Sequence, residues 1–291
     1  MAYFFLTLIF LFGAGLGSFV AVIANRYNTG LPWSKGRSIC FSCNTQLQKN
    51  DLVPIFSFLF LKGRCRYCQS KIPKETFFVE ILMGIFSVLA FIKSGLFVYD
   101  FSAIILNLGF IINLFQYLLL TSIFAVILLI SVYDFKHFII PDSFLIIFFI
   151  LAISSKLVTL NSLSFILSSK LLALSLSSGF ILTLPFLIIF LISKGRWIGF
   201  GDVKYITVIG FFLGFTVGLS AVVLSFWIGA AFSLVALFLK KITHFINLPL
   251  LKNNLTIKSE IPFGPFLSLG VIISFYLSLD LFHINELLNL F

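Results

Sequence analysis

Charged side chains are scarce in this sequence. Only 10% of its 291 residues are Asp, Glu, Lys or Arg, whereas 60% are hydrophobic and 18% aromatic. A chain of this composition cannot bury its apolar surface in one or two water-soluble cores. Its apolar residues form long runs, such as 181–192 and 217–239, and about 20 such residues cross the hydrocarbon core of a bilayer as a helix. The alternation typical of a membrane β-barrel is missing.

The sequence therefore predicts an all-α polytopic membrane protein with about eight transmembrane helices. The expected spans lie near 3–24, 77–93, 101–133, 143–160, 171–193, 203–218, 219–239 and 263–284. The first run has no basic residue before it, unlike a signal peptide, and we expect it to be retained. Within that run, Gly13 and Gly17 have the spacing that lets two helix backbones approach closely. We divide the chain into a first transmembrane helix (1–24), a cysteine-rich domain (25–76) and a transmembrane domain (77–291).

Basic residues are unevenly distributed along the chain. In the predicted topology nearly all of the 20 Lys and Arg fall on one side of the membrane, together with the large loop 25–76. Short cytoplasmic loops retain such charges, so that loop is expected in the cytoplasm. The formal net charge of +10 is accounted for by contacts with anionic headgroups. The sequence has no basic face interleaved with aromatic residues, which is the pattern that would indicate nucleic-acid binding.

Cysteine is limited to four residues, all in the segment 25–76. They form two CxxC pairs, Cys40 with Cys43 and Cys65 with Cys68, separated by 21 residues. Four thiolates at this spacing favour a structural zinc site, as in a zinc ribbon. Two disulfides are the alternative, which a reducing cytoplasm disfavours. A domain of about 50 residues needs such a reinforcement because it buries little apolar surface.

Acidic residues number only 10, and two of them lie at predicted membrane boundaries. Asp134 follows the third apolar run, where the negative end of the helix dipole opposes a carboxylate. Asp202 follows two glycines in the motif Gly199-Phe200-Gly201-Asp202-Val203-Lys204. In the predicted topology both residues reach the same membrane face. A solvated surface acid is the alternative for Asp134, and a helix N-cap is the alternative for Asp202.

Other residues near these aspartates have supporting roles in this interpretation. Gly199 and Gly201 permit close backbone approach or unusual dihedral angles. Glu80, about one turn inside the second span, is expected to line the site or pair with a base. Asp142, after Pro141, is interpreted mainly as a helix cap.

Two converging carboxylates point to one kind of chemistry. They do not both ionise easily, so they share a proton and their pKa values separate. One then acts as a base on a water molecule, and the other as an acid toward the carbonyl that the water attacks. No set of residues for a serine, cysteine or metal mechanism is found.

Several further motifs follow one another in order along nearly the whole chain. They are Gly17-Ser18-Phe19 with Arg26, the two CxxC pairs with Asp51-Leu52-Val53-Pro54 and Gly63-Arg64-Cys65-Arg66, Val79-Glu80, Asp134 with Ile140-Pro141-Asp142, Gly199 to Lys204, and Ile261-Pro262-Phe263-Gly264-Pro265-Phe266. With these motifs the chain resembles the prepilin peptidase family of GxGD-type aspartic membrane peptidases.

This resemblance implies a bifunctional enzyme of the bacterial inner membrane, serving type IV pili or type II secretion. Asp134 and Asp202 would be its catalytic pair, with Gly199, Gly201, Lys204 and Glu80 supporting them. Its substrates would be prepilins or pseudopilins, cut after the last glycine of the leader on the cytoplasmic side. The new N-terminal residue would then be methylated using S-adenosylmethionine, an activity that the resemblance links to the cysteine-bearing loop.

Two other functions remain as alternatives. A general GxGD intramembrane aspartic protease without methylation would not need the cysteine domain. A small ion-coupled transporter would place acids near the middle of the membrane and show repeats between its halves. Neither feature is found in the sequence.

Overall fold

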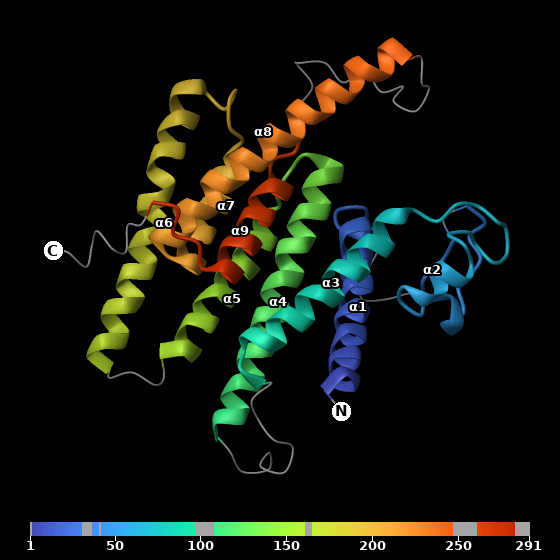
Figure 1. The fold of residues 1–291 in the computed structure, drawn as a ribbon, viewed down its shortest axis with the longest axis horizontal. Helices are drawn as coiled ribbons and strands as arrows, with labels where there is room; N and C mark the ends of the chain where they lie inside the picture. The colour runs from blue at the N-terminus through green and yellow to red at the C-terminus, as the bar shows by residue number, and fades with distance from the viewer. Residues whose placement is uncertain are drawn as a thin grey trace. The chain divides into compact units, whose positions relative to one another are not determined.

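The structure is a computed structural model that describes residues 2–30, 37–40, 42–96, 108–160, 165–246 and 261–282. These residues are nearly all helical, which confirms the predicted fold class (Figure 1). The part described contains no β-strand, only isolated bridges between Ile39 and Gln46 and between Arg64 and Lys71. The elements are α1 (Ala2–Arg26), a short 3-10 helix (Lys49–Asp51), α2 (Phe56–Phe60), α3 (Lys74–Lys93), α4 (Leu108–His137), α5 (Asp142–Leu160), α6 (Phe165–Ser193), α7 (Phe200–Leu213), α8 (Phe215–Ile246) and α9 (Gly264–Leu277).

Among the described residues, five helices are long and apolar enough to cross a membrane. They lie within α1, α3, α4, α6 and α8, and the chain is a multi-pass membrane protein. The count of eight spans stays a prediction, and the first part of the expected span 101–133 lies outside the described residues.

Helix α7 is shorter than the span expected at 203–218. It has 14 residues, or about 21 Å at 1.5 Å per residue, less than the ~30 Å of the hydrocarbon core. Gly214 ends it, with a positive φ of 83° that suits glycine and terminates a helix. Helix α8 then begins at Phe215, earlier than predicted.

The chain forms two compact units, Met1–Val132 (unit 1) and Tyr133–Phe291 (unit 2). The three-part division made from the sequence stays a prediction.

In unit 1, α1 packs closely against α3 through small residues (Figure 1). A Cβ atom added to Gly17 would lie 2.8 Å from the Cα of Glu80, and one added to Gly13 would collide with Ser87. This confirms the prediction that these glycines serve helix packing. Helix α3 also contacts α4, where the hydroxyls of Ser87 and Tyr117 lie 2.8 Å apart and form a buried hydrogen bond.

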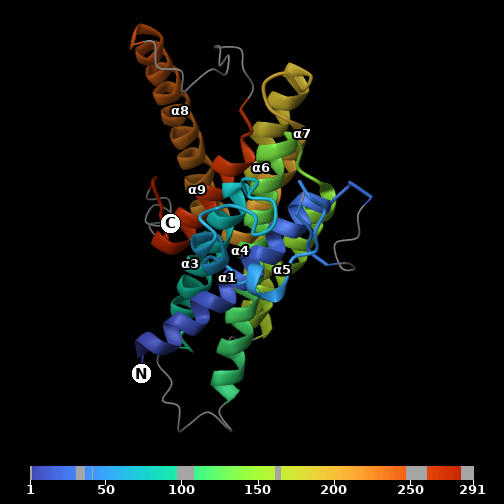
Figure 2. The ribbon, with the colours of Figure 1, turned by 90° about the vertical axis from the view of Figure 1, so that its right-hand side faces the viewer.

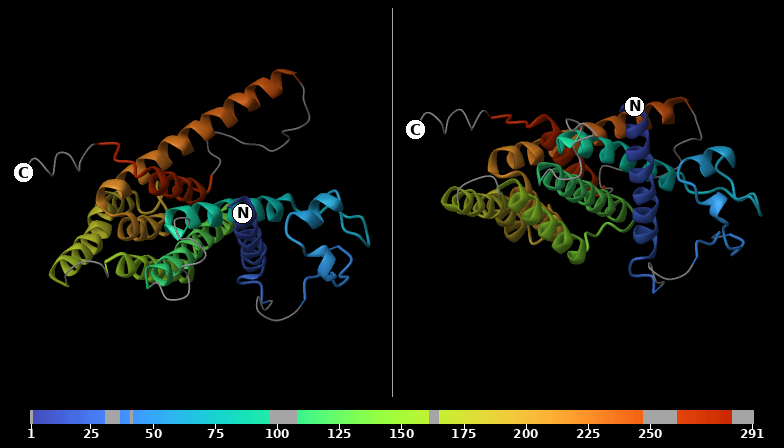
Figure 3. Two further views of the ribbon diagram at one scale, coloured as in Figure 1. Left: turned by 60° about the horizontal axis from the view of Figure 1, so that its bottom comes forward. Right: turned by 90° about the horizontal axis from the view of Figure 1, so that it is seen from below.

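In unit 2, α7 packs against α5, α6, α8 and α9 (Figures 2 and 3). Its Tyr205, Ile206 and Ile209 are fully buried. Glycines bring α6 and α7 together, since a Cβ on Gly210 would lie 2.6 Å from the Cα of Gly179. A short helix enclosed on this many sides is held firmly, and its first turn carries Asp202.

Candidate active site

Asp134 lies in the last turn of α4 and is 5% exposed. Its Oδ2 accepts a hydrogen bond of 2.9 Å from the backbone N–H of Gly264, the first residue of α9. The first N–H groups of a helix have no partner within the helix, and its N-terminus favours a negative charge. The unfavourable dipole of α4 noted from the sequence is therefore offset by the favourable dipole of α9.

Asp202 is the third residue of α7, and the N-cap of that helix is Gly199. The interpretation of Asp202 as an N-cap is therefore wrong. Gly199 has the extended conformation of a capping residue (φ −71°, ψ 147°), and its backbone N–H donates to the Asp202 carboxylate. The helix thus begins at Phe200, two residues before the aspartate.

The two carboxylates interact electrostatically within unit 2. Asp202 lies outside the five long apolar helices. Burial, followed by the negative charge of Asp134, raises the pKa of Asp202 to about 7, although the Gly199 N–H opposes this rise. A carboxyl group with such a pKa keeps its proton over most of the acidic range and is about half protonated at pH 7, which suits an acid in an acid–base pair.

The two glycines of the motif provide room, not unusual dihedral angles. A Cβ on Gly199 would lie 3.3 Å from Oδ2 of Asp202, and one on Gly201 would lie 3.3 Å from the Cβ of Ile140. Neither glycine is among the positive-φ residues. Of the two roles expected from the sequence, the structure shows close approach.

Lys204 joins the start of α7 to the start of α5. Its Nζ donates to both carboxylate oxygens of Asp142, at 2.7 and 2.9 Å, and lies 4.6 Å from the centre of the Phe200 ring. Asp142 opens α5, but its carboxylate is engaged by Lys204 and its side chain is 65% exposed. The pair connects the two helix starts at the exposed surface.

A buried hydroxyl pair connects α7 to α9, and sequence reasoning missed it. The hydroxyls of Tyr205 and Ser268 lie 2.8 Å apart, and Ser268 donates to the carbonyl of Gly264 at 2.9 Å. These hydrogen bonds connect α7 to the first turn of α9, and the Gly264 N–H in that turn binds Asp134. A polar Ser268 within an apolar run was the available signal, because a buried hydroxyl requires a partner.

Glu80 belongs to unit 1 and is 6% exposed. Its Oε2 accepts a hydrogen bond of 2.7 Å from the backbone N–H of Ile55. Ile55 has a φ of +64°, a conformation that a β-branched residue rarely adopts. In the structure Glu80 therefore holds a strained turn of the cysteine-rich domain against α3.

The four cysteines come together on two matching turns. The N–H of Asn44 donates to the carbonyl of Cys40 at 2.9 Å, and the N–H of Gln69 donates to that of Cys65 at 3.0 Å. The four Sγ atoms all lie within 4.8 Å of one another, near the spacing of about 3.8 Å that tetrahedral Zn–S bonds of 2.3 Å impose.

The backbone favours a thiolate at this cluster. The N–H groups of Cys43 and Ser42 lower the pKa of the Cys40 thiol to about 6, although burial opposes this. Hydrogen bonds from the hydroxyl and N–H of Ser70 lower the pKa of Cys68. Metals bind the thiolate form, and the four thiols could hold a metal ion.

Comparison with known proteins agrees with this arrangement. Residues 11–94 match the Bacterial Peptidase A24 N-terminal domain, and residues 121–234 match the Type IV leader peptidase family. The two matches follow each other in order and together cover more than half of the chain. The chain belongs to the type IV leader peptidase family. The matches include all four cysteines and Glu80 in the first segment, and Asp134 and Asp202 in the second.

Two relatives within this leader peptidase family are similar along most of their length, and a third is similar over a short segment. A "Prepilin leader peptidase/N-methyltransferase" of Bacillus subtilis is 27% identical over 271 residues, which are 93% of each chain. One of Vibrio cholerae is 29% identical over 227 residues, 74% of this chain and 79% of the relative. A "Type 4 prepilin-like proteins leader peptide-processing enzyme" of Escherichia coli is 44% identical over 54 residues, 19% of this chain and 20% of the relative. No solved structure matches the chain.

Proposed function

We propose that this chain is a prepilin leader peptidase in which Asp134 and Asp202 activate a water molecule. The observation that carries the proposal is the electrostatic interaction of these two carboxylates within unit 2. The names of the relatives, prepilin leader peptidase/N-methyltransferase, supply the substrate class. We infer cleavage of prepilin or pseudopilin leaders after a glycine.

The surroundings of the two aspartates support different roles for them. Asp134 accepts the Gly264 N–H at the start of α9, which stabilises its ionised form. Asp202 has a pKa raised to about 7 by burial and by Asp134. We assign Asp134 as the base and Asp202 as the acid.

The reaction then follows in two proton-balanced steps. Asp134 takes a proton from water, the water oxygen bonds to the peptide carbonyl carbon, and Asp202 gives its proton to the carbonyl oxygen. In the second step the C–N bond breaks, Asp134 returns its proton to the leaving nitrogen, and Asp202 regains one from the tetrahedral hydroxyl. Both residues are restored, and no covalent enzyme intermediate forms.

We also propose that the cysteine cluster holds a structural zinc ion. Four protein thiolates leave no open coordination position, so zinc would stabilise the cysteine-rich domain without entering the reaction. Methylation of the new N-terminus with S-adenosylmethionine is proposed from the names of the relatives. The described residues of unit 1 include no glycine-rich nucleotide loop, so no residue is assigned to this cofactor.

The proposed location is the bacterial inner membrane, with the cysteine-rich domain in the cytoplasm. The distribution of Lys and Arg in the sequence supports this orientation. The substrates would therefore be cut at the cytoplasmic face.

The test is incubation of the purified full chain, in detergent, with a purified prepilin that carries a Gly-Phe junction. Intact mass spectrometry is expected to find the leader ending in glycine and the mature protein. With S-adenosylmethionine the mature protein should gain one methyl group, and without it none. A prepilin that stays uncut, or is cut elsewhere, would contradict the proposal.

A further inference from the structure

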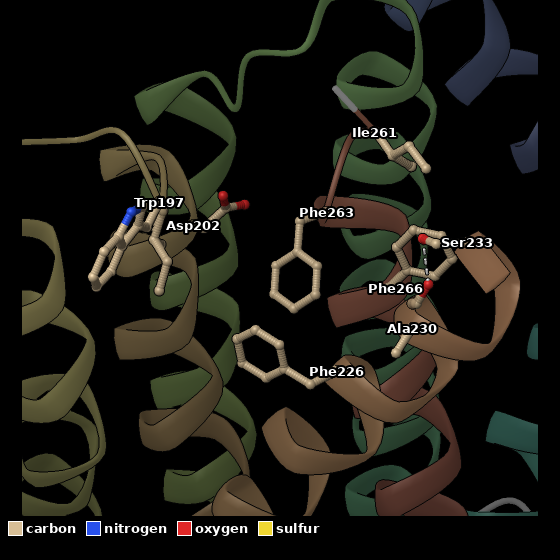
Figure 4. A pocket seen from close by; sticks show the side chains of 10 residues that line it. Trp197, Asp202, Phe226, Ala230, Ser233, Ile261, Phe263 and Phe266 are labelled. Carbon is tan, nitrogen blue, oxygen red and sulfur yellow. Dashed lines mark hydrogen bonds between the residues drawn. The ribbon is translucent and has the colours of Figure 1, made fainter. Parts of the chain in front are cut away.

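A pocket of about 370 Å³ lies beside Asp202 within unit 2 (Figure 4). Its lining includes Trp197 from the loop before α7, Phe226 and Gly229 from α8, and Phe263 and Phe266 at the start of α9. Among the described residues that line the pocket, Asp202 is the only one with a carboxylate. The pocket therefore joins one of the two acidic groups to a wall of aromatic rings.

Most of this wall offers only apolar contact. The Ser233 hydroxyl, which also lines the pocket, donates to the carbonyl of Gly229 at 2.7 Å and so is satisfied within α8. Phe263 and Phe226 have ring centres 4.7 Å apart. A ligand that fits must present a bulky apolar group next to a polar group that Asp202 can reach.

Gly229 sets the room available in the pocket. A Cβ atom added there would lie 3.4 Å from Cδ2 of Phe266, in van der Waals contact with the ring. A longer side chain at this position would extend into the space between α8 and α9. The glycine thus keeps open the volume that a ligand side chain would occupy.

We propose that this pocket binds the large apolar side chain of the residue that follows the cleaved bond, with Gly229 as the residue that determines its size. The inference rests on the proposed function. Cleavage after glycine leaves no side chain on the leader side, so a side chain that fills a pocket beside Asp202 comes from the next residue. A volume near the lower end of the ~300–1,000 Å³ of ligand pockets suits one aromatic or long aliphatic side chain.

The test compares prepilins that carry Phe, Leu or Ala after the cleaved bond. For the wild type, kcat/KM should be at least about tenfold higher with Phe than with Ala. Gly229→Leu should lower kcat/KM for the Phe substrate about tenfold more than for the Ala substrate. The matched control is Ala231→Leu, an exposed position on the same helix outside the pocket, which should leave the Phe-to-Ala ratio unchanged.

A second variant tests the pocket even if Gly229→Leu does not fold. Ala230 lines the pocket and is exposed on α8, so Ala230→Leu narrows the pocket without disturbing the packed interior. It should shift the ratio in the same direction. If the wild type cleaves Phe and Ala substrates equally, or if neither variant changes the ratio, the pocket proposal is overturned while the proposed function stands.

A binding measurement separates the pocket from catalysis. Replacing Trp33 and Trp227 with phenylalanine leaves Trp197 as the only tryptophan of the three. Its emission should change when a peptide product beginning with Phe is added, and not with one beginning with Ala. If the wild type cleaves no prepilin, the proposed function fails, whereas the emission result still decides the pocket. Emission that responds to brominated lipid acyl chains but to neither peptide would assign the pocket to lipid and overturn the proposal.

Discussion

Asp134 and Gly264 are 130 residues apart in the sequence, yet the carboxylate of the first accepts the backbone N–H of the second at 2.9 Å. The residue after Gly264 is Pro265, which has no N–H. The bond therefore uses one of the few free donors at the start of α9. The position of this helix start determines where one of the two aspartates points.

Replacing Gly264 with alanine should displace that carboxylate. A Cβ at Gly264 would lie 2.6 Å from Oδ2 of Asp134, closer than the two atoms can approach. We expect Gly264→Ala to lower kcat/KM for prepilin cleavage by about 100-fold, as a misplacement of about 1 Å can do. Gly15→Ala is the control, because a Cβ there has no atom within 4 Å. Equal activity of the two variants would argue against the position assigned to Asp134.

The pH dependence of cleavage follows from Asp202. Its pKa is raised to about 7, so it keeps its proton up to that pH and loses it above. Because Asp202 acts as the acid, kcat/KM should fall as the pH rises through about 7, by up to about tenfold per pH unit. A pH profile with unfolding measured in parallel checks this. Activity that rises steadily between pH 7 and 9 would contradict the assignment.

The cysteine cluster predicts the metal content of the protein. Purified wild type should carry about one zinc ion per chain, and Cys68→Ser should lose most of it, because a structural site uses four ligands. Elemental analysis by mass spectrometry measures this. Ser42→Ala, which keeps all four thiols, serves as the control. Full zinc content in Cys68→Ser would show that the four cysteines are not the ligands.

Loss of the Glu80 carboxylate should loosen the turn at Ile55 in unit 1. Glu80→Ala removes the acceptor of the Ile55 N–H, which costs about 1–3 kcal/mol when a buried donor is left without a partner. Hydrogen exchange in the segment 52–60 should become about tenfold faster or more. Glu80→Gln keeps an oxygen acceptor and should preserve most of the protection. Unchanged exchange in Glu80→Ala would show that this bond does not hold the turn.

The sequence was sufficient for much of this account. Long apolar runs predicted the helices, because lipid requires an internally bonded backbone. The CxxC spacing predicted a cluster that the structure brings together, and the positions of Asp134 and Asp202 suggested that they converge. The first two inferences rest on local patterns, and the third rests on the predicted membrane topology.

Other features of the site could be found only from the folded structure. Nothing in the sequence near Asp134 indicates Gly264 as its partner, since their contact depends on the packing of α9 in unit 2. The sequence offered an N-cap as the alternative role of Asp202, because aspartate is a common capping residue, but Gly199 fills that role in α7. The pocket beside Asp202 combines residues from α8, α9 and the loop before α7, a combination that no single segment reveals.

The most direct test of the account compares three conservative variants in one prepilin cleavage assay. Asp134→Asn and Asp202→Asn each remove one titratable group and almost no volume. Asp142→Asn is the matched control, because that carboxylate is largely exposed and paired with Lys204, where an ion pair contributes only about 0–1 kcal/mol. With folding and zinc content unchanged, we predict that the first two variants lose cleavage and that Asp142→Asn stays within about threefold of the wild type. Normal cleavage by either Asp134→Asn or Asp202→Asn would contradict the two-aspartate mechanism.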